Sequence, residues 1–222
     1  SPRNSVVLPE TIVCPAFPAA GRTIYLGHLF VGDALLSDSP MRHHPLTPMT
    51  DSHLVRVLAR QTRQKVGLIP HAEVAAGTAR IRQAFDRLAA AGVRYSVVDA
   101  LHDEDLLAIG AACSDLALVT AGSGIALGLP GNFVRSGMLA PGADAARLPA
   151  ERGPAAVLAG SCSEGTRRQV AVMARHHRAI AIDPLRADDP DVLARSALDA
   201  AGGDIGAGRT VLFHSSADPQ QV

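Results

Sequence analysis

The chain has 222 residues, of which 47% are hydrophobic and 3% aromatic, and its 21 Lys and Arg balance its 21 Asp and Glu. This balance excludes the clustered positive charge of a nucleic-acid surface, and no apolar run approaches the roughly 20 residues that span a bilayer. Cys14, Cys113 and Cys162 are odd in number and widely spaced, so they predict neither a disulfide framework nor a zinc pattern. We expect a cytoplasmic protein that binds neither nucleic acid nor membrane and has no metal site.

The first elements along the chain are predicted from short aliphatic runs and turn residues. A strand is expected at 12–14, and two apolar runs on either side of Gly32 and Asp33 predict a hairpin. Asp51 is expected to cap the helix that follows it. A strand at 65–69 comes next, and together these signals predict a mixed α/β fold.

A helical spacing of Ile81 and Phe85 predicts a long helix that ends before Gly92. Acidic residues then predict the start of a second helix, because negative charges are favourable at the positive N-terminal end of the helix dipole. In order, we expect a strand at 95–98, a helix at 103–113, a strand at 116–119, a helix starting at 121–124 and a structural break at 128–132.

Gly and Pro accumulate between 137 and 153, and this change of composition indicates an interdomain linker. The repeated order of strand, helix and strand on both sides predicts parallel pairing with right-handed crossovers. The predicted fold is α/β, with two parallel-sheet domains, helices on the sheet faces and a cleft between the domains. The second domain is expected to contain strands at 155–159, 179–182 and 210–213 and helices at about 166–176 and 190–201.

The strongest local signal for chemistry is the turn that contains Gly160, Ser161 and Ser163 and leads to Thr166. A buried strand ends there and a helix begins, and the free N–H groups of a helix N-terminus favour a phosphate. The alternative is that Ser161, Ser163 and Thr166 only cap the helix. The sequence has no Walker lysine and no dinucleotide glycine fingerprint.

A similar turn contains Gly122, Ser123 and Gly124, and it predicts either an anion site or a tight strand–helix junction. The segment 41–51 holds the densest group of polar residues, and its prolines keep it extended. A histidine there orients a substrate hydroxyl or carboxylate, or else the segment is a rigid surface turn.

Arg22 and His28 lie near the expected hairpin. The Arg22 guanidinium has the geometry to clamp a carboxylate with two hydrogen bonds. Residues of this kind are more often partners in a local ion pair, so both interpretations stay open.

Several stretches together resemble the four-carbon acid sugar kinases, and in particular the branch that acts on 3-oxo-tetronate. The order and spacing of these stretches run through nearly the whole chain, and the string His-Pro-Leu-Thr-Pro-Met is far more specific than a glycine loop. The stretches are 14–18, 21–25, 27–31, 44–51, 122–124, 127–130 and 160–163.

The resemblance implies a sugar-acid-binding domain at 1–138, a linker at 139–153 and an ATP-binding domain at 154–222. It implies ATP with Mg²⁺ as cofactors and a small acid sugar as partner, and it allows a homodimer. Phosphoryl transfer to the terminal hydroxyl of the sugar acid is the implied activity. The implied nucleotide contacts are Gly160, Ser161 and Ser163, and the implied substrate contacts are Arg22, His28, His43, His44, Thr47, Gly122, Ser123 and Gly124.

Two motifs of that family do not occur in this sequence: the Asp-Asp-x-Thr-Gly-Ala loop and the glycine-rich Gly-Gly-Glu-Thr-Ser-Gly loop. Their absence leaves the catalytic base unassigned, and we expect that the chain begins within the first domain and ends within the second, so that both domains are partial. The main alternative is a non-catalytic sugar-acid or nucleotide sensor. A nicotinamide oxidoreductase is a further alternative, although the missing glycine fingerprint opposes it. The last alternative is an assembly domain that binds no ligand.

Overall fold

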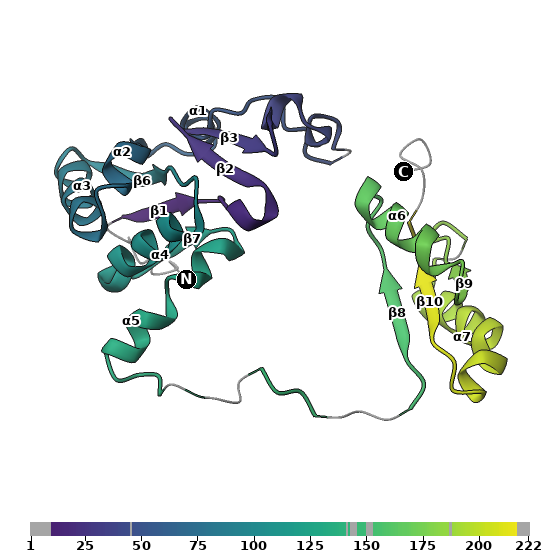
Figure 1. Ribbon diagram of the computed structural model, residues 1–222. Coiled ribbons are helices and arrows are strands. Elements are labelled where there is room, and N and C mark those ends of the chain that lie inside the picture. Colours follow the sequence, from purple (N-terminus) through teal and green to yellow (C-terminus); the bar gives the residue numbers. More distant parts are fainter. Residues whose placement is uncertain are drawn as a thin grey trace, which may run out of the picture. The chain divides into compact units, whose positions relative to one another are not determined.

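The computed structural model describes residues 10–44, 46–140, 142, 146–149, 153–186 and 188–216. The chain divides into two compact units, residues 1–143 (unit 1) and residues 144–222 (unit 2) (Figure 1). Among the described residues, every helix is too short or too polar to cross a membrane.

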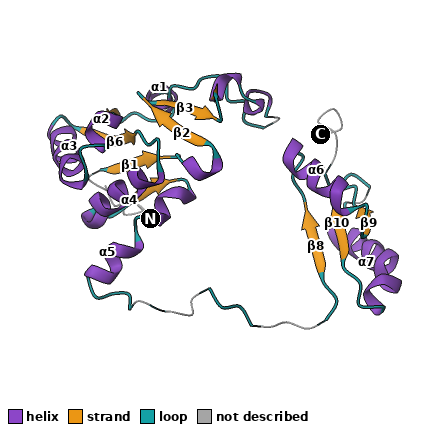
Figure 2. Ribbon diagram, viewed as in Figure 1, coloured by secondary structure: helices purple, strands orange, loops and turns teal. Residues whose placement is uncertain are grey.

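Unit 1 is built on a parallel sheet of four strands in the order β5-β6-β1-β7. Figure 2 labels β1 and β6 of this sheet, with the strands in orange. Their side chains read as short aliphatic runs, as expected for strands covered by helices. The strands are β1 (Thr11–Cys14), β5 (Lys65–Ile69), β6 (Val93–Val98) and β7 (Val119–Ala121).

Two helices, α3 (Thr78–Ala90) and α4 (Asp103–Ala112), supply much of the core of unit 1. Ile81 of α3 and Ile109 of α4 are fully buried in the same cluster as Ile12 of β1. The helical spacing of Ile81 and Phe85 therefore correctly predicted the buried face of α3.

An antiparallel sheet of β2 (Arg22–Tyr25), β3 (His28–Val31) and β4 (Ala34–Leu35) lies at the carboxyl end of the parallel strands. Ile24 joins it to that end through two backbone hydrogen bonds with Ala100, of 2.8 and 3.0 Å. The hairpin predicted at Gly32 and Asp33 is confirmed, because Gly32 takes a left-handed φ of 63° between β3 and β4.

Short helices connect these elements. Most of them begin or end at Pro, Ser or Asp, residues that favour turns. They are η1 (Pro18–Ala20), η2 (Leu36–Asp38), η3 (Pro40–His43), α1 (Leu54–Ala59), α2 (His71–Val74), η4 (Cys113–Asp115), η5 (Ser123–Leu127) and α5 (Pro130–Arg135).

Two predicted elements of unit 1 are wrong in position. The strand expected at 116–119 begins only at Val119, because it pairs with Ile12 of β1, which sets the register. The break expected at 128–132 is confined to 128–129, between η5 and α5, because α5 begins at Pro130, which occupies a first-turn position that needs no N–H.

The predicted cap of α1 is also wrong. His53 is the N-cap residue, and its Nδ1 accepts the backbone N–H of Arg56 at 3.1 Å. The Asp51 carboxylate instead pairs with the Arg56 side chain at 2.6 Å, which competes with capping for its oxygens.

Unit 2 has a parallel sheet of three strands in the order β8-β10-β9. Ala201 of α7 and Val211 of β10 are fully buried in its core. The elements are β8 (Ala156–Ala159), α6 (Glu164–Met173), β9 (Arg178–Ala181), α7 (Pro190–Gly206) and β10 (Val211–His214).

Helix α7 continues past its predicted end near residue 201, through Gly202 and Gly203. The left-handed φ of 70° that follows the helix belongs to Gly208. Glycine ends a helix only where the chain adopts that conformation. The predicted fold class of two parallel sheets with helices on their faces is confirmed, whereas the domain bounds and the cleft stay predictions.

Candidate functional site

Asp99 directly follows β6 and is fully buried at the carboxyl edge of the parallel sheet of unit 1. Its carboxylate accepts the backbone N–H groups of Leu26 at 2.7 Å, Gly27 at 2.9 Å and His71 at 3.0 Å. Leu26 and Gly27 form the turn between β2 and β3 with left-handed φ values of 49° and 75°. Successive residues in such conformations present their N–H groups to one anion.

Burial raises the pKa of Asp99 above its ordinary value, while the three backbone N–H groups and His71 oppose that rise. A carboxylate without such donors would be costly at this depth. Asp99 thereby fixes the β2–β3 turn and the start of α2 to the same edge of the sheet.

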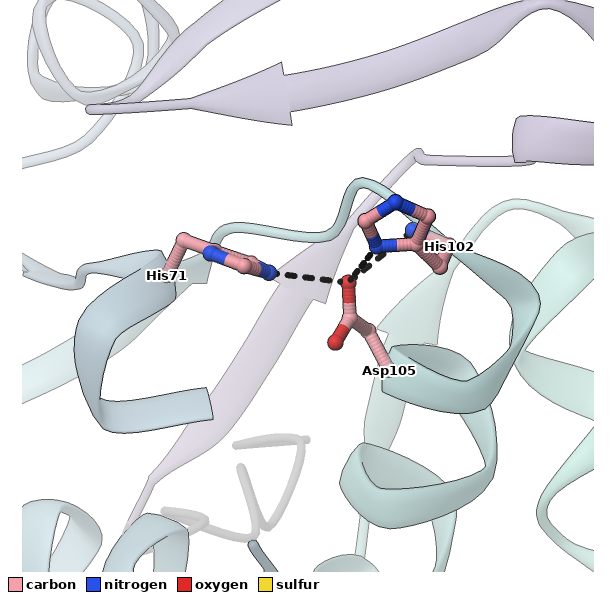
Figure 3. Close-up of side chains that lie close together, drawn as sticks. All are labelled: His71, His102 and Asp105. Atoms are coloured by element: carbon pink, nitrogen blue, oxygen red, sulfur yellow. Dashed lines mark hydrogen bonds and ion pairs between the residues drawn. The ribbon is translucent and has the colours of Figure 1, made fainter. Parts of the chain in front are cut away.

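Three side chains beside this anchor come together (Figure 3). His71 Nε2 lies 3.2 Å from Asp105 Oδ2, and His102 Nδ1 lies 3.7 Å from the same oxygen. Asp105 Oδ2 also accepts the backbone N–H groups of Leu101 at 2.8 Å and His102 at 2.9 Å. Asp105 thus holds the first turn of α4 and faces both imidazoles.

The cluster of His71, His102 and Asp105 is open on one side. The His102 side chain is 68% exposed, whereas those of His71 and Asp105 are 20% and 11% exposed. Ligands of open α/β sheets bind beyond the carboxyl ends of the strands. Imidazole and carboxylate groups in this position can bind a metal ion or exchange a proton with a ligand.

Sequence reasoning missed Asp99, His71, His102 and Asp105. The available signal was their position, since His71 follows β5 and both Asp99 and His102 follow β6. Because β5 and β6 are neighbours in the sheet, residues just after them lie close together. That adjacency could not be inferred from composition or spacing alone.

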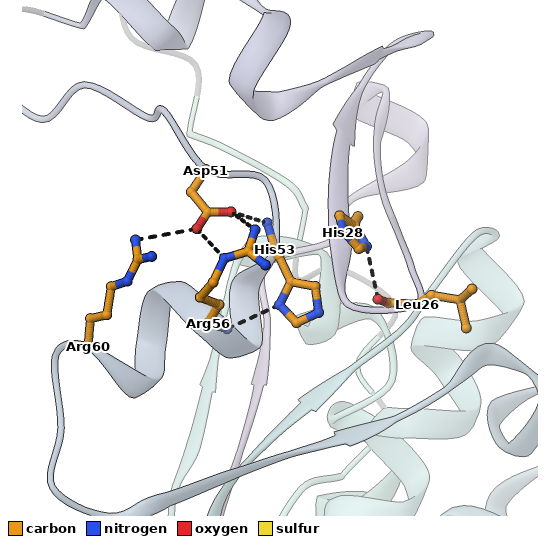
Figure 4. A network of polar contacts seen from close by, with 6 residues as sticks. All are labelled: Leu26, His28, Asp51, His53, Arg56 and Arg60. Carbon is orange, nitrogen blue, oxygen red and sulfur yellow. Dashed lines mark hydrogen bonds and ion pairs between the residues drawn. The ribbon is translucent and has the colours of Figure 1, made fainter.

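A second polar network surrounds Asp51 (Figure 4). Its carboxylate accepts from Arg56 Nε at 2.7 Å and Nη2 at 2.6 Å, and from the backbone N–H of His53 at 3.0 Å. The Arg56 hydrogen bonds hold the pKa of Asp51 well below its usual range. The network anchors the segment that precedes α1.

His28, a predicted substrate contact, lies beside this network. Its Nδ1 is 3.0 Å from the carbonyl oxygen of Leu26, and its ring meets that of His53 edge to face at 4.6 Å. Arg22 is exposed at the start of β2. The structure therefore places His28 near the β2–β3 turn, and the binding roles of both residues stay predictions.

The predicted loop contacts His43, His44 and Thr47 lie at and after the end of η3. His43 is exposed, and His44 Nδ1 accepts the backbone N–H of Thr47 at 3.1 Å. Pro45, between them, lies outside the described residues. The structure brings His44 and Thr47 together, while their contact with a substrate stays a prediction.

The turn with Gly122, Ser123 and Gly124 has a packing reason for its glycines. The Gly122 N–H donates to the Cys14 carbonyl at 3.1 Å, and a Cβ on Gly124 would lie 2.6 Å from the carbonyl oxygen of Ala16. The glycines thus allow a close approach within the chain. Ser123 is exposed, and its contact with a ligand stays a prediction.

In unit 2, the capping role of Ser163 is confirmed, because its Oγ accepts the N–H of Thr166 at 3.2 Å. Ser163 N–H donates to Ser161 Oγ at 3.2 Å, and Ser216 Oγ donates to the Ser161 carbonyl at 2.8 Å. The turn is therefore held by hydroxyl groups of its own and by that of Ser216, which follows β10. A cavity of about 310 Å³ adjoins it, lined by Val157, Leu158, Ala159, Gly160, Ser161, Thr166, Gln169, Val170, Met173 and Leu212.

A family model described as a sugar-binding N-terminal domain matches residues 3–129, which is more than half of the chain. The chain belongs to this family. A second model, described as a nucleotide-binding C-terminal domain, matches residues 156–222. The resemblance drawn from the sequence motifs is thus confirmed at the level of the family.

Relatives with assigned names extend the comparison. The chain is 51% identical over 213 residues to a 3-oxo-tetronate kinase of Cupriavidus necator, covering 96% of this chain and 49% of the relative. It is also 51% identical over 212 residues to a 3-oxo-tetronate kinase of Burkholderia multivorans, with the same coverage. The chain therefore spans about half the length of the curated relatives it matches.

A solved structure agrees with the fold of this family. A crystal structure from Salmonella typhimurium LT2, of a protein described as a candidate tRNA synthase, is 36% identical with a TM-score of 0.71. The match covers 96% of this chain and 50% of that one.

Proposed function

We propose that this chain serves the ATP-dependent phosphorylation of a four-carbon acid sugar, such as 3-oxo-tetronate, on its terminal hydroxyl. The observation that carries the proposal is the 51% identity over 213 residues to a protein named 3-oxo-tetronate kinase. That alignment covers 96% of the chain, and the two family models match residues 3–129 and 156–222. Identity at this level supports a shared reaction class.

In this proposal unit 2 binds ATP at the turn of Gly160, Ser161 and Ser163. The Ser163 hydroxyl already caps α6, so the free N–H groups of the first turn and the exposed Ser161 are the groups left for phosphate oxygens. This donor set fits a phosphate. Mg²⁺, which prefers oxygen ligands and retains several waters, would be held mainly by the phosphates and would neutralise their charge.

Unit 1 binds the acid sugar in the same proposal. The carboxyl edge of its sheet carries the β2–β3 hairpin, whose turn is fixed by Asp99. Arg22 at the start of that hairpin supplies a guanidinium for the substrate carboxylate. His28 and the pair of His44 and Thr47 supply hydrogen-bonding groups for hydroxyls, with His43 and the 122–124 turn as further contacts.

A coupled assay of ADP release tests the reaction. We expect ADP release that depends on 3-oxo-tetronate, and we expect Ser161→Ala to lower kcat/KM for ATP by roughly tenfold or more, since hydrogen bonds to charged groups contribute about 1.5–3 kcal/mol. Ser196→Ala, on the exposed face of α7, is the matched control and should leave the rate unchanged. Equal background rates with tetronates and threonates would contradict the proposal.

Thiol chemistry tests the location of the nucleotide separately from turnover. Burial raises the pKa of the Cys14 and Cys113 thiols to about 12, and both are buried. Cys162 is half-buried within the 160–163 turn. Iodoacetamide at pH 8 should therefore modify Cys162 alone, because the thiolate is the reactive form. ATP should slow that modification, and an unchanged rate would place the nucleotide elsewhere.

The alternative is a non-catalytic protein that binds a sugar acid or a nucleotide. Calorimetric binding of ATP without any substrate-dependent ADP release would support this alternative over the kinase.

We further propose a cytoplasmic location and a homodimer. All three cysteines are free thiols, which suits a reducing compartment. Light scattering that returned the mass of one chain would contradict the dimer.

A further inference from the structure

In the cluster of His71, His102 and Asp105, both imidazoles lie near one carboxylate oxygen at separations typical of neighbouring donors around a metal ion. The donor atoms of the three side chains lie within 4.8 Å of one another. The distances of 3.2 and 3.7 Å to Asp105 Oδ2 are close to the roughly 3.3 Å between neighbouring donors of a tetrahedral ion with bonds of about 2.0–2.1 Å. Small movements of the side chains would complete such a site.

The three donors are held by rigid elements. His71 opens α2 directly after β5, and its backbone N–H is fixed by Asp99 at 3.0 Å. Asp105 lies in the first turn of α4 and is oriented by the N–H groups of Leu101 and His102. Groups that orient metal ligands in this way raise the affinity of a site.

Helix capping accounts for only part of this arrangement. Capping of α4 needs the Asp105 carboxylate and the N–H groups at 101 and 102, and it places no requirement on His71. The His71 ring nevertheless faces Asp105 from a different element, with 20% of its side chain exposed (Figure 3). His71 Nε2 and Asp105 Oδ2 form a hydrogen bond at 3.2 Å, and His102 Nδ1 lies 3.7 Å from the same oxygen, so three metal-binding groups converge at one point.

We propose that His71, His102 and Asp105 bind one divalent transition-metal ion of the Zn²⁺ type. Two imidazoles and a carboxylate are donors that such ions prefer. The exposed side of His102 leaves a coordination position open, which would take an oxygen of a carboxylate or hydroxyl ligand. This site was not expected from the sequence, because His71 is distant along the chain from His102 and Asp105, which have an i,i+3 spacing. The site does not depend on the proposed kinase activity.

Calorimetric titration of the tag-free chain with ZnCl₂ tests the proposal. We expect one ion per chain and a rise in the thermal midpoint on addition of Zn²⁺. His102→Ala, at a largely exposed position, should weaken Zn²⁺ binding at least about tenfold while circular dichroism stays unchanged. His71→Ala should have a similar or larger effect.

His176→Ala, in the segment after α6, removes a histidine outside the cluster and is the matched control that should leave the affinity unchanged. Absence of saturable binding to the unmodified chain would overturn the proposal. So would an affinity that His102→Ala leaves intact, and this variant decides the question even where His71→Ala fails to fold.

Discussion

At the scale of single residues, Asp99 shows how one buried carboxylate organises a site. It receives backbone N–H groups from the β2–β3 turn and from the start of α2, segments that are distant from one another in sequence. The left-handed φ of 49° at Leu26 is unusual for a side chain of this kind and persists because the carboxylate holds the turn.

Removing this acceptor leaves three N–H groups without their partner. We expect Asp99→Ala to lower the free energy of unfolding by about 2–5 kcal/mol, since each unsatisfied buried group costs about 1–3 kcal/mol. Urea denaturation followed by circular dichroism measures the change. Asp33→Ala, exposed in the β3–β4 turn, is the control, and equal unfolding midpoints for the two variants would contradict the anchoring role.

At the scale of elements, glycines set how closely segments of unit 1 approach. A Cβ on Gly110 of α4 would lie 2.5 Å from backbone atoms of Gly128, and one on Gly124 would lie 2.6 Å from the Ala16 carbonyl oxygen. Helix α4 can therefore approach the backbone at Gly128, and η5 can approach the backbone at Ala16, only with glycine at these positions. The glycines in α7 have no such reason, because a Cβ on Gly202 meets nothing within 4 Å.

The same substitution should thus have opposite effects in the two elements. We expect Gly124→Ala to destabilise the chain by about 1–3 kcal/mol through overpacking. Gly202→Ala should stabilise α7 by about 0.5–1 kcal/mol, because alanine restricts the unfolded chain and favours the helix. Thermal and urea unfolding of both variants check this, and a loss of stability in Gly202→Ala would contradict the packing argument.

At the scale of the whole molecule, each unit has its own core. The larger cluster joins β1, β5 and β6 to α3 and α4, and the smaller one joins α7 to β9 and β10. Ile81 belongs to the first cluster and Ile180 to the second. All the described residues of each cluster belong to a single unit.

Matched isoleucine truncations should therefore act on one unit each. Ile81→Ala is expected to cost about 2–5 kcal/mol and to reduce hydrogen-exchange protection in unit 1, while Ile180→Ala should do so in unit 2. Mass spectrometry of exchanging peptides locates the change. Loss of protection in both units from either variant would show that the two cores unfold as one.

Local sequence signals predicted most elements but placed some of them wrongly. Alternating aliphatic runs and helical spacings identified β5, β6, α3 and α4, since their burial follows from residue type alone. The start of β7 was placed too early, because its register depends on pairing with Ile12. The cap at His53 was missed because Asp51 has a stronger partner in Arg56.

By itself the sequence determined the parallel α/β architecture and, through its motifs, the family. Both follow from patterns that can be read along the chain. Only the tertiary structure decided that His71 meets Asp105 and that Asp99 binds the β2–β3 turn, because strand order brings together residues 34 and 73 positions apart. Side chains at the carboxyl edge of a sheet become neighbours because their strands pair, and no local sequence pattern specifies which strands pair.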